Sequence, residues 1–518
     1  MFVGANLSGA RLDAAVMSGV DFRDVVAPGS RWDDVKALAV VADRADLGNA
    51  SLVRASLPMA KLGGARLVGA VLDQAVLLGA ELLGAELSAA HLGRTMLARA
   101  TLSGARFEDA NLEEAVFAMA DLRGADLSLA KLARCVFASA DLRGVKLPKS
   151  LVGCQFANAR MSSRDAAPAG TAPPDAADDV EAWLPSFEGA DLSNTTFAGV
   201  NLEGADLRGA KLELANFAGC PLAGAQLEGA QLKQGVFVDA DLSGVDLSGQ
   251  KLELTVFSSA KLVGANLAGA RAELTAFDRA DLRGANLERA FVTKARFEGA
   301  TLDDVKLEGA SFERVDFSGV DVSKVALRGL SLVRCSFHDT DLSGKDLSLC
   351  NLIGSGFAKA KLERALFQKA KLENASFEGA NLEGAHFEDA QAKGAFFADA
   401  SLRAARFDRA ALRFAVFKKA HADGAAFPGA DARETDFSES TVDAASFSGA
   451  RLSLADFSHA SAKNTDFTNA DLTSANLHNT KEEGAVFSRA TLTKVRRTDI
   501  DRLEAEAWAP PPKPATYP

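Results

Sequence analysis

The sequence is poor in the residues that active sites, secreted folds and nucleic-acid surfaces use most. Its 518 residues include one Tyr, three Trp, six His and five Cys, and the net charge of -11 leaves no basic excess for nucleic acid. The longest apolar run, VKALAVVA at 35–42, is too short to span a bilayer, and the start of the chain lacks the apolar segment of a signal peptide. We therefore expect a cytoplasmic protein with no nucleic-acid or membrane partner.

What the sequence does contain is a five-residue rhythm. A large apolar residue, here called the centre, stands at positions ending in 2 or 7, from Phe2 and Leu7 to Phe487 and Leu492, and a small residue stands two places earlier. Neither an α-helix nor a flat strand repeats every five residues. A unit with two apolar positions can bury them only if the chain coils and its turns stack.

A second period gives the number of sides per turn. Phe occupies the centre at every twentieth residue from 197 to 457, and a second series, offset by ten, runs from 367 to 487. Four pentads per turn place each Phe directly above the previous one, whereas three would scatter them. The pattern predicts an all-β, four-sided parallel β-helix whose interior is filled and whose two Phe ladders line opposite walls.

The repeat units resemble a known family. GADLR, GANLE and GARFE are similar to the A(D/N)LXX consensus of pentapeptide-repeat proteins, and the resemblance covers nearly the whole chain. It implies a right-handed quadrilateral β-helix (solenoid) with four pentapeptides per coil. It implies much less about function, because the family hosts several roles.

Breaks in the rhythm predict the domain boundaries. One block of repeats covers 1–161, with a phase slip of one residue at Cys154 and Phe156, and a second covers 186–495. The Ala/Pro/Asp-rich segment 162–185 reads as a flexible linker or loop, so one continuous rod and two hinged rods are both open. In segment 496–518, Thr498 is expected to cap a short helix that carries Glu504 and Glu506, ends near Trp508, covers the open C-terminal edge and precedes a Pro-rich tail.

The unusual side chains are expected to be structural. The five Cys, which occupy the small inward position, are expected to be buried free thiols, typical of a reducing compartment; they are Cys135, Cys154, Cys220, Cys335 and Cys350. The six His stand at outward positions, none near another in sequence, and are expected on the solvated surface; they are His91, His338, His386, His421, His459 and His478. Gln250, Leu330 and Lys345 interrupt the small inward position, where we expect local distortion. SGKDLS at 343–348 lacks the earlier Gly of a phosphate loop, since residue 339 is Asp.

No catalytic constellation, metal site, cofactor site or small-molecule site is predicted. The sequence therefore favours a non-catalytic, protein-binding scaffold; long proteins of the family that it resembles include bacterial accessory proteins near secretion systems. The alternative that the resemblance offers is a DNA mimic that binds DNA gyrase. That role needs a continuous acidic face, yet residues 1–150 carry 17 acidic and 17 basic residues. The repeat starts at Phe2 without a cap, so we also expect self-association through the N-terminal end, which Leu7→Lys should disturb.

Overall fold

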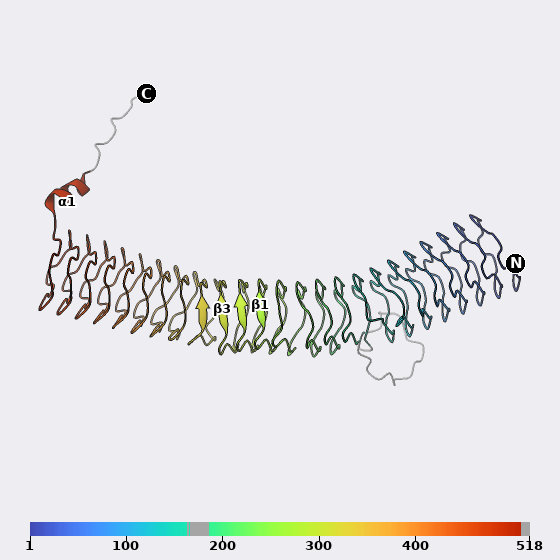
Figure 1. Cartoon of the computed structure of the whole chain (residues 1–518), viewed down its shortest axis with the longest axis horizontal. Helices are drawn as coiled ribbons and strands as arrows, with labels where there is room; N and C mark the ends of the chain where they lie inside the picture. The colour runs from blue at the N-terminus through green and yellow to red at the C-terminus, as the bar shows by residue number, and fades with distance from the viewer. Residues whose placement is uncertain (163–164, 166–185, 509–518) are drawn as a thin grey trace, which may run out of the picture. The chain divides into compact units, whose positions relative to one another are not determined.

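The chain folds into four-walled coils that stack within each of two units (Figure 1). The computed structural model describes residues 1–162, 165 and 186–508, and the two compact units are Met1–Asn286 and Leu287–Pro518. Within each unit, parallel bridges join residues twenty apart, as in Arg31↔Ser51 and Asp316↔Ser336. The predicted quadrilateral parallel β-helix is thus confirmed. We number its walls 1, 6, 11 and 16, by their first residue in the first coil.

Most walls are too short to form extended strands. The elements with strand geometry on adjacent residues are β1 (Arg271–Glu273) in the first unit and β2 (Phe291–Thr293), β3 (Ser311–Glu313) and β4 (Ser331–Val333) in the second. β2, β3 and β4 pair in parallel, with Val292 opposite Phe312 and Phe312 opposite Leu332. Elsewhere the chain turns after each bridge, because the centre carbonyl accepts the N–H three residues later.

The pentad 121–125 shows why the consensus begins with Asp or Asn. Four of the five N–H groups in this pentad donate to backbone carbonyls. The fifth, the N–H of Arg123, donates to Asp121 Oδ1 at 3.1 Å. The remaining four donate to the carbonyls of Ala100, Asp141, Arg143 and Leu122. An acidic or amide side chain at the first position therefore completes the backbone hydrogen bonding of its own pentad.

The interior is a dry column of rings and small side chains. Phe217 and Phe237 are buried and stack with centroids 5.1 Å apart and planes 8° from parallel. In the second unit two such ladders run along the shaft and meet edge to face, as Phe357 and Phe367 do at 6.0 Å. Both geometries are favourable for aromatic rings. The stacked Phe ladders predicted from the twenty-residue period are confirmed.

The coil stack of the first unit continues on both sides of the predicted linker. Ser150 pairs with Asp191 and Gln155 with Thr196, and Phe156 stacks on Phe197 at 5.2 Å. The coil before them has one residue fewer, because Val136 pairs with Gln155, which accounts for the phase slip. Apart from Ser162 and Asp165, segment 162–185 lies outside the described residues.

The C-terminal helix exists but differs from the prediction in two ways. Helix α1 spans Ile500–Ala507, and its N-cap is Asp499, whose side chain accepts from Arg502 N; Thr498 Oγ1 instead accepts the N–H of Asn479. The helix lies beside the last coils and does not cover the end of the stack (Figure 1), where Leu492 stays 39% exposed. No residue of α1 is buried. The predicted tail beyond residue 508 lies outside the described residues.

Candidate functional site

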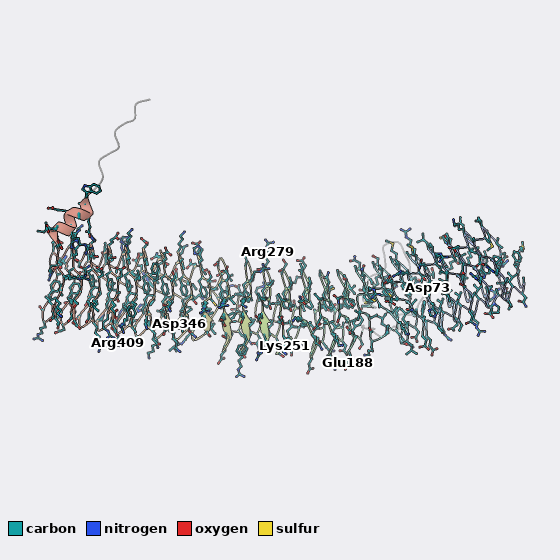
Figure 2. The ribbon with its side chains drawn as sticks, turned by 45° about the horizontal axis from the view of Figure 1, so that its top comes forward. Asp73, Glu188, Lys251, Arg279, Asp346 and Arg409 are labelled. Atoms are coloured by element: carbon teal, nitrogen blue, oxygen red, sulfur yellow. The ribbon has the colours of Figure 1, made fainter. Side chains whose placement is uncertain are left out.

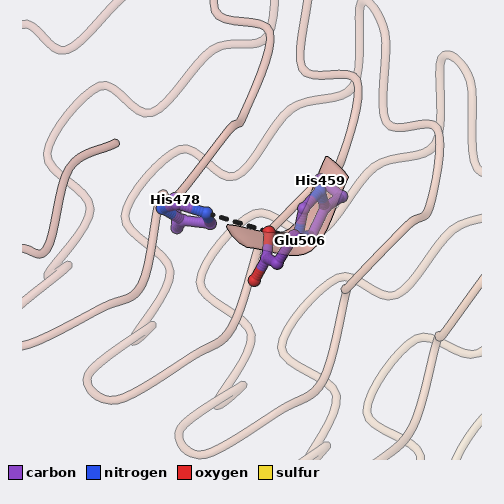
Figure 3. Close-up of side chains that lie close together, drawn as sticks. All are labelled: His459, His478 and Glu506. Atoms are coloured by element: carbon purple, nitrogen blue, oxygen red, sulfur yellow. Dashed lines mark hydrogen bonds and ion pairs between the residues drawn. The ribbon is translucent and has the colours of Figure 1, made fainter. Parts of the chain in front are cut away.

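One cluster of ligand-type side chains forms where α1 meets the last coils (Figure 3). His459 and His478 come from adjacent coils and Glu506 from the helix. Glu506 Oε2 lies 3.1 Å from His459 Nε2 and 3.2 Å from His478 Nε2. Within 1–162, 165 and 186–508, this is the one group of three or more His, Cys, Asp or Glu side chains whose donor atoms could share a metal ion.

Each member of the cluster is oriented by a further hydrogen bond. His478 is only 2% exposed, and its Nδ1 accepts the N–H of Asp499 at 3.1 Å. His459 Nδ1 lies 3.0 Å from Asn479 Nδ2. Glu506 Oε1 accepts from Arg502 Nε at 2.6 Å, a pair one helical turn apart. The N-terminus of α1 and its last turn are thus both tied to the coils.

The electrostatics of the cluster favour an ionised Glu506. The hydrogen bond from Arg502 lowers the pKa of Glu506, with further lowering from His478. A carboxylate that accepts hydrogen bonds from N–H groups such as those of Arg502 and His478 is stabilised in its charged form. The contribution of this group to stability is present above the pKa of the unfolded chain and is lost as the pH falls through the folded value.

The hydrogen bonding indicates a latch instead of a metal site. Two imidazoles and one carboxylate are a donor set that Zn²⁺ takes in proteins. A metal-binding imidazole, however, donates a proton from its other nitrogen. In His478 that nitrogen, Nδ1, accepts the N–H of Asp499, so the proton lies on Nε2, the atom that faces Glu506. This arrangement lets His478 donate to Glu506, with His459 Nε2 3.1 Å from the same oxygen, and it holds α1 against the coils.

Proximity along the chain does not reveal this cluster, so it is absent from the sequence-based predictions. His459 and His478 are 19 residues apart, which places them on adjacent coils of one wall, and His478 is buried and not on the solvated surface as expected. The signal that could have found them is a pair of His one coil apart. His338 and His386 contact only nearby acids, Asp339 and Glu388, at 2.9 Å each.

The Cys side chains are part of the shaft. All five are buried and free, and the thiol donates to a centre carbonyl of the preceding coil in Cys135, Cys220, Cys335 and Cys350. The neighbouring Cys154 and burial raise the pKa of Cys135. Burial raises the pKa of Cys220 and of Cys335 to about 12 and that of Cys350 to about 11. Thiols in this state are poor nucleophiles at neutral pH.

Lys345, Gln250 and Leu330 do interrupt the coil as expected. Lys345 Nζ donates to the carbonyls of Ser323 and Val325, and burial lowers the pKa of Lys345. In the described part of the second unit, no ladder bridge joins residues 321 and 326 to the neighbouring coils, and Leu330 is buried in that loosened coil. Gln250 Nε2 donates to Leu227 O at 2.8 Å. Beside it, no β-bridge joins residue 226 to residue 246 of the next coil.

The shaft leaves little room for a substrate. Two enclosed apolar voids within it measure about 10 Å³ beside Phe297 and about 20 Å³ beside Trp32. Such spaces are at the size of a single water molecule. The polar and charged side chains lie on the outside, as Figure 2 shows for Asp73, Glu188 and Lys251 in the first unit and for Asp346 and Arg409 in the second.

These observations define a class of protein: a filled, four-walled solenoid of five-residue units whose outward faces carry its chemistry. A family model described as pentapeptide repeats (8 copies) matches residues 1–26, 60–148, 186–249, 251–329, 331–368, 370–409 and 410–501. These segments make up more than half of the chain. The chain therefore belongs to the pentapeptide-repeat family.

Among the solved structures that the chain resembles are pentapeptide-repeat proteins and a resistance protein. A trypsin-treated form of QnrB1, a plasmid-mediated fluoroquinolone resistance protein, is 20% identical over 44% of this chain and 88% of its own, with a TM-score of 0.22. HetL of the cyanobacterium Nostoc sp. strain PCC 7120, involved in heterocyst differentiation regulation, is 21% identical over 60% of this chain and 88% of its own (TM-score 0.12). Rfr23 of the cyanobacterium Cyanothece 51142 is 24% identical over 24% and 86% (TM-score 0.14). No curated protein sequence matches the chain.

A search for membrane-spanning helices gives a negative result. Among residues 1–162, 165 and 186–508, no helix has the length and apolar character needed to cross a bilayer.

Proposed function

We propose that this chain is a non-catalytic scaffold that binds other proteins through its outward walls. The observation that carries this proposal is the combination of a shaft filled with rings and walls on which polar side chains repeat in register. Such a molecule offers large, rigid, ribbed surfaces, and the two voids described within its shaft are too small for a substrate. The proposal places it in the cytoplasm, as an accessory of a larger bacterial assembly such as a secretion system, and the five free thiols fit that compartment.

Charges on the walls are organised into pairs between adjacent coils. Arg409 pairs with Asp389 at 2.8 Å and Arg413 with Glu434 at 2.6 Å. The acids of these walls are therefore partly neutralised by neighbouring guanidinium groups, which is unlike the continuous acidic face that a DNA mimic requires. On this ground we place scaffold binding above gyrase binding, and a gyrase supercoiling assay with saturating protein is expected to show no inhibition.

One exposed spot on the second unit has the composition of a binding hot spot. Phe414 is 41% exposed, with the guanidinium of Arg413 4.6 Å from its ring centre and Lys393 Nζ 5.7 Å away. Aromatic and Arg side chains carry a large share of the binding energy in protein interfaces. The cation contacts also hold the ring in place before binding, which lowers the entropic cost of docking.

The test is capture of partners from the native host with immobilised full-length protein. Phe414→Ala should reduce recovery of at least one specific partner about tenfold, an effect of about 1.4 kcal/mol. Leu349→Ala, at a comparably exposed apolar side chain of the same unit, should not. The proposal fails if the immobilised protein retains no partner that survives a salt wash, or if both variants recover the same amount of every partner.

Self-association through the first coil is part of the same proposal. Phe2 stays 45% exposed, and Asn6 and Arg11 have a ladder partner on one side only. Open ladder edges of this kind favour pairing with another chain. Leu7→Lys, which places a charge at this end, should then lower the association constant. An unchanged sedimentation profile would count against this contact.

A further inference from the structure

Wall 16 of the first unit differs from the other walls because it is almost uncharged. Its bridges run Val76↔Met96↔Val116↔Val136↔Gln155↔Thr196↔Asn216. Three residues per coil face outward on this wall, at the bridge and at the two turn positions. Between residues 56 and 219, Arg99 is the one charged residue at these outward positions. We call this stretch the apolar wall.

The apolar wall lacks the hydrogen bond that the consensus provides. Where the consensus has Asp or Asn, it carries Val76, Met96, Val116 and Val136. The turn N–H groups that would donate to such a side chain have no protein partner among the described residues; they belong to Leu78, Ala98, Ala118 and Ala138. The pentads that begin with Arg66 and Glu81 on other walls lack this bond too, so it is the near absence of charge that sets the apolar wall apart.

The Phe ladder behind this wall does not explain its apolar surface. In the second unit the same wall also covers stacked Phe rings, yet charged residues stand at its outward positions; they include Lys359, Glu378, Asp399, Lys418 and Lys419. An uncharged exterior is therefore a property of the first unit and not a requirement of the ladder. Met119 is 58% exposed there, which makes it typical of an interaction surface.

Side-chain size is distributed unevenly along the wall. At the two turn positions, each coil nearer the N-terminus presents a large side chain, and the coils that follow present only Ala, Gly, Ser or Asn. The large side chains are Met59, Leu78, Arg99 and Met119. The small ones are Ala138, Ser139, Ala157, Asn158, Ala198, Gly199, Ala218 and Gly219. A surface with one bulky half and one small half is complementary to itself when turned end over end.

We propose that the apolar wall is the interface with a second copy of this chain, docked antiparallel about a two-fold axis between the coils of Met119 and Ser139. This register places Leu78 opposite Ala198 of the partner subunit and Met59 opposite Gly219 of the partner subunit. It also places Arg99 opposite the partner subunit's Asn158, whose side-chain oxygen can accept from it. The proposal is independent of the scaffold function, since walls 1, 6 and 11 stay free for other partners.

The size of the wall fits a weak dimer. Coils stacked about 4.8 Å apart make the eight coils from Met59 to Gly219 roughly 38 Å long, and a wall is roughly 12 Å wide. The footprint is thus roughly 450 Å² per copy, well below the roughly 800 Å² of a standard specific interface. We therefore expect a dissociation constant on the order of tens of micromolar.

Sedimentation of the full chain from about 1 to about 100 µM tests the interface. The wild type should shift from monomer to dimer, and the double variant Leu78→Glu/Met119→Glu should raise the dissociation constant at least tenfold. The matched control is Leu83→Glu, a side chain 59% exposed on wall 1, which should leave it unchanged. Circular dichroism confirms that each variant retains the fold. A monomer at every concentration, an equal effect of Leu83→Glu, or a dimer that Leu78→Glu/Met119→Glu leaves intact overturns the proposal.

Cross-linking tests the antiparallel register separately. Ala98 and Ala157 are both half-buried. In the proposed register Ala98 faces Ala157 of the partner subunit, whereas the two copies of residue 98 would lie about 14 Å apart along the wall. A mixture of Ala98→Cys and Ala157→Cys proteins should form a disulfide-linked dimer, and Ala98→Cys alone should not. The native thiols are buried and do not interfere. Cross-linking of Ala98→Cys alone, or none in the mixture, contradicts the register.

Discussion

Phe397→Ala is expected to be the most damaging kind of single change, because four rings hold this side chain. Phe397 is fully buried, with Phe377 and Phe417 stacked on its two faces at 4.9 and 4.7 Å. Phe387 and Phe407 meet it edge to face at 5.7 and 5.6 Å. Truncating a buried Phe to Ala costs about 3–5 kcal/mol, and the lost ring contacts favour the upper half of that range. We expect about 4 kcal/mol.

Hydrogen exchange is the right assay, because each coil of a solenoid contacts only its neighbours and opens locally. A loss of about 4 kcal/mol corresponds to about a thousandfold faster exchange in the coils around residue 397. The matched control is Phe414→Ala, a partly exposed ring whose cation contacts are worth less than about 1 kcal/mol. Equal acceleration in both variants, or none near residue 397, would refute the stacking argument.

Three further predictions follow from the site and the walls. Glu506→Gln removes the charge that both imidazoles and Arg502 contact, so residues 499–508 should exchange and be cleaved by proteases faster, whereas Glu504→Gln on the same helix should not have this effect. The native protein should show almost no reaction with a thiol reagent at pH 8 and five reactive thiols in denaturant, because burial holds the pKa of Cys220 at about 12. Hydrogen bonds from Arg208 and Arg433 lower the pKa of Asp206 and Asp431, so their stabilisation is present above about pH 4 and lost below it; the melting temperature by circular dichroism should fall between about pH 4 and pH 2 and stay level between about pH 5 and pH 8.

The sequence predicted the shaft well because one physical requirement repeats in every pentad. A five-residue unit has two inward positions, so the identity of a residue follows from its place in the period. Phe217, Phe237 and Cys220 therefore lie where the rhythm put them. Lys345 and Gln250 were recognised as disturbances for the same reason, and both open the ladder beside them.

The parts that escaped prediction depend on contacts between coils or beyond the repeat. His459 and His478 meet only because their positions are one coil apart, and Glu506 reaches them from an element with no period. The choice of Asp499 over Thr498 as N-cap depends on which side chain accepts from Arg502 N, and both residue types are good caps. A local pattern cannot decide either question.

The case for a covered surface depends on charge and not on the turn hydrogen bond. From residue 56 to residue 219, wall 16 of the first unit carries one charged residue, Arg99, at its outward positions, whereas the same wall of the second unit carries several; they include Lys359, Glu378, Asp399 and Lys418. Folding of the coils does not select against such charges, because the outward positions are solvated in both units. A wall that lacks charge and also exposes Leu78 and Met119 is best explained by a surface that another chain covers.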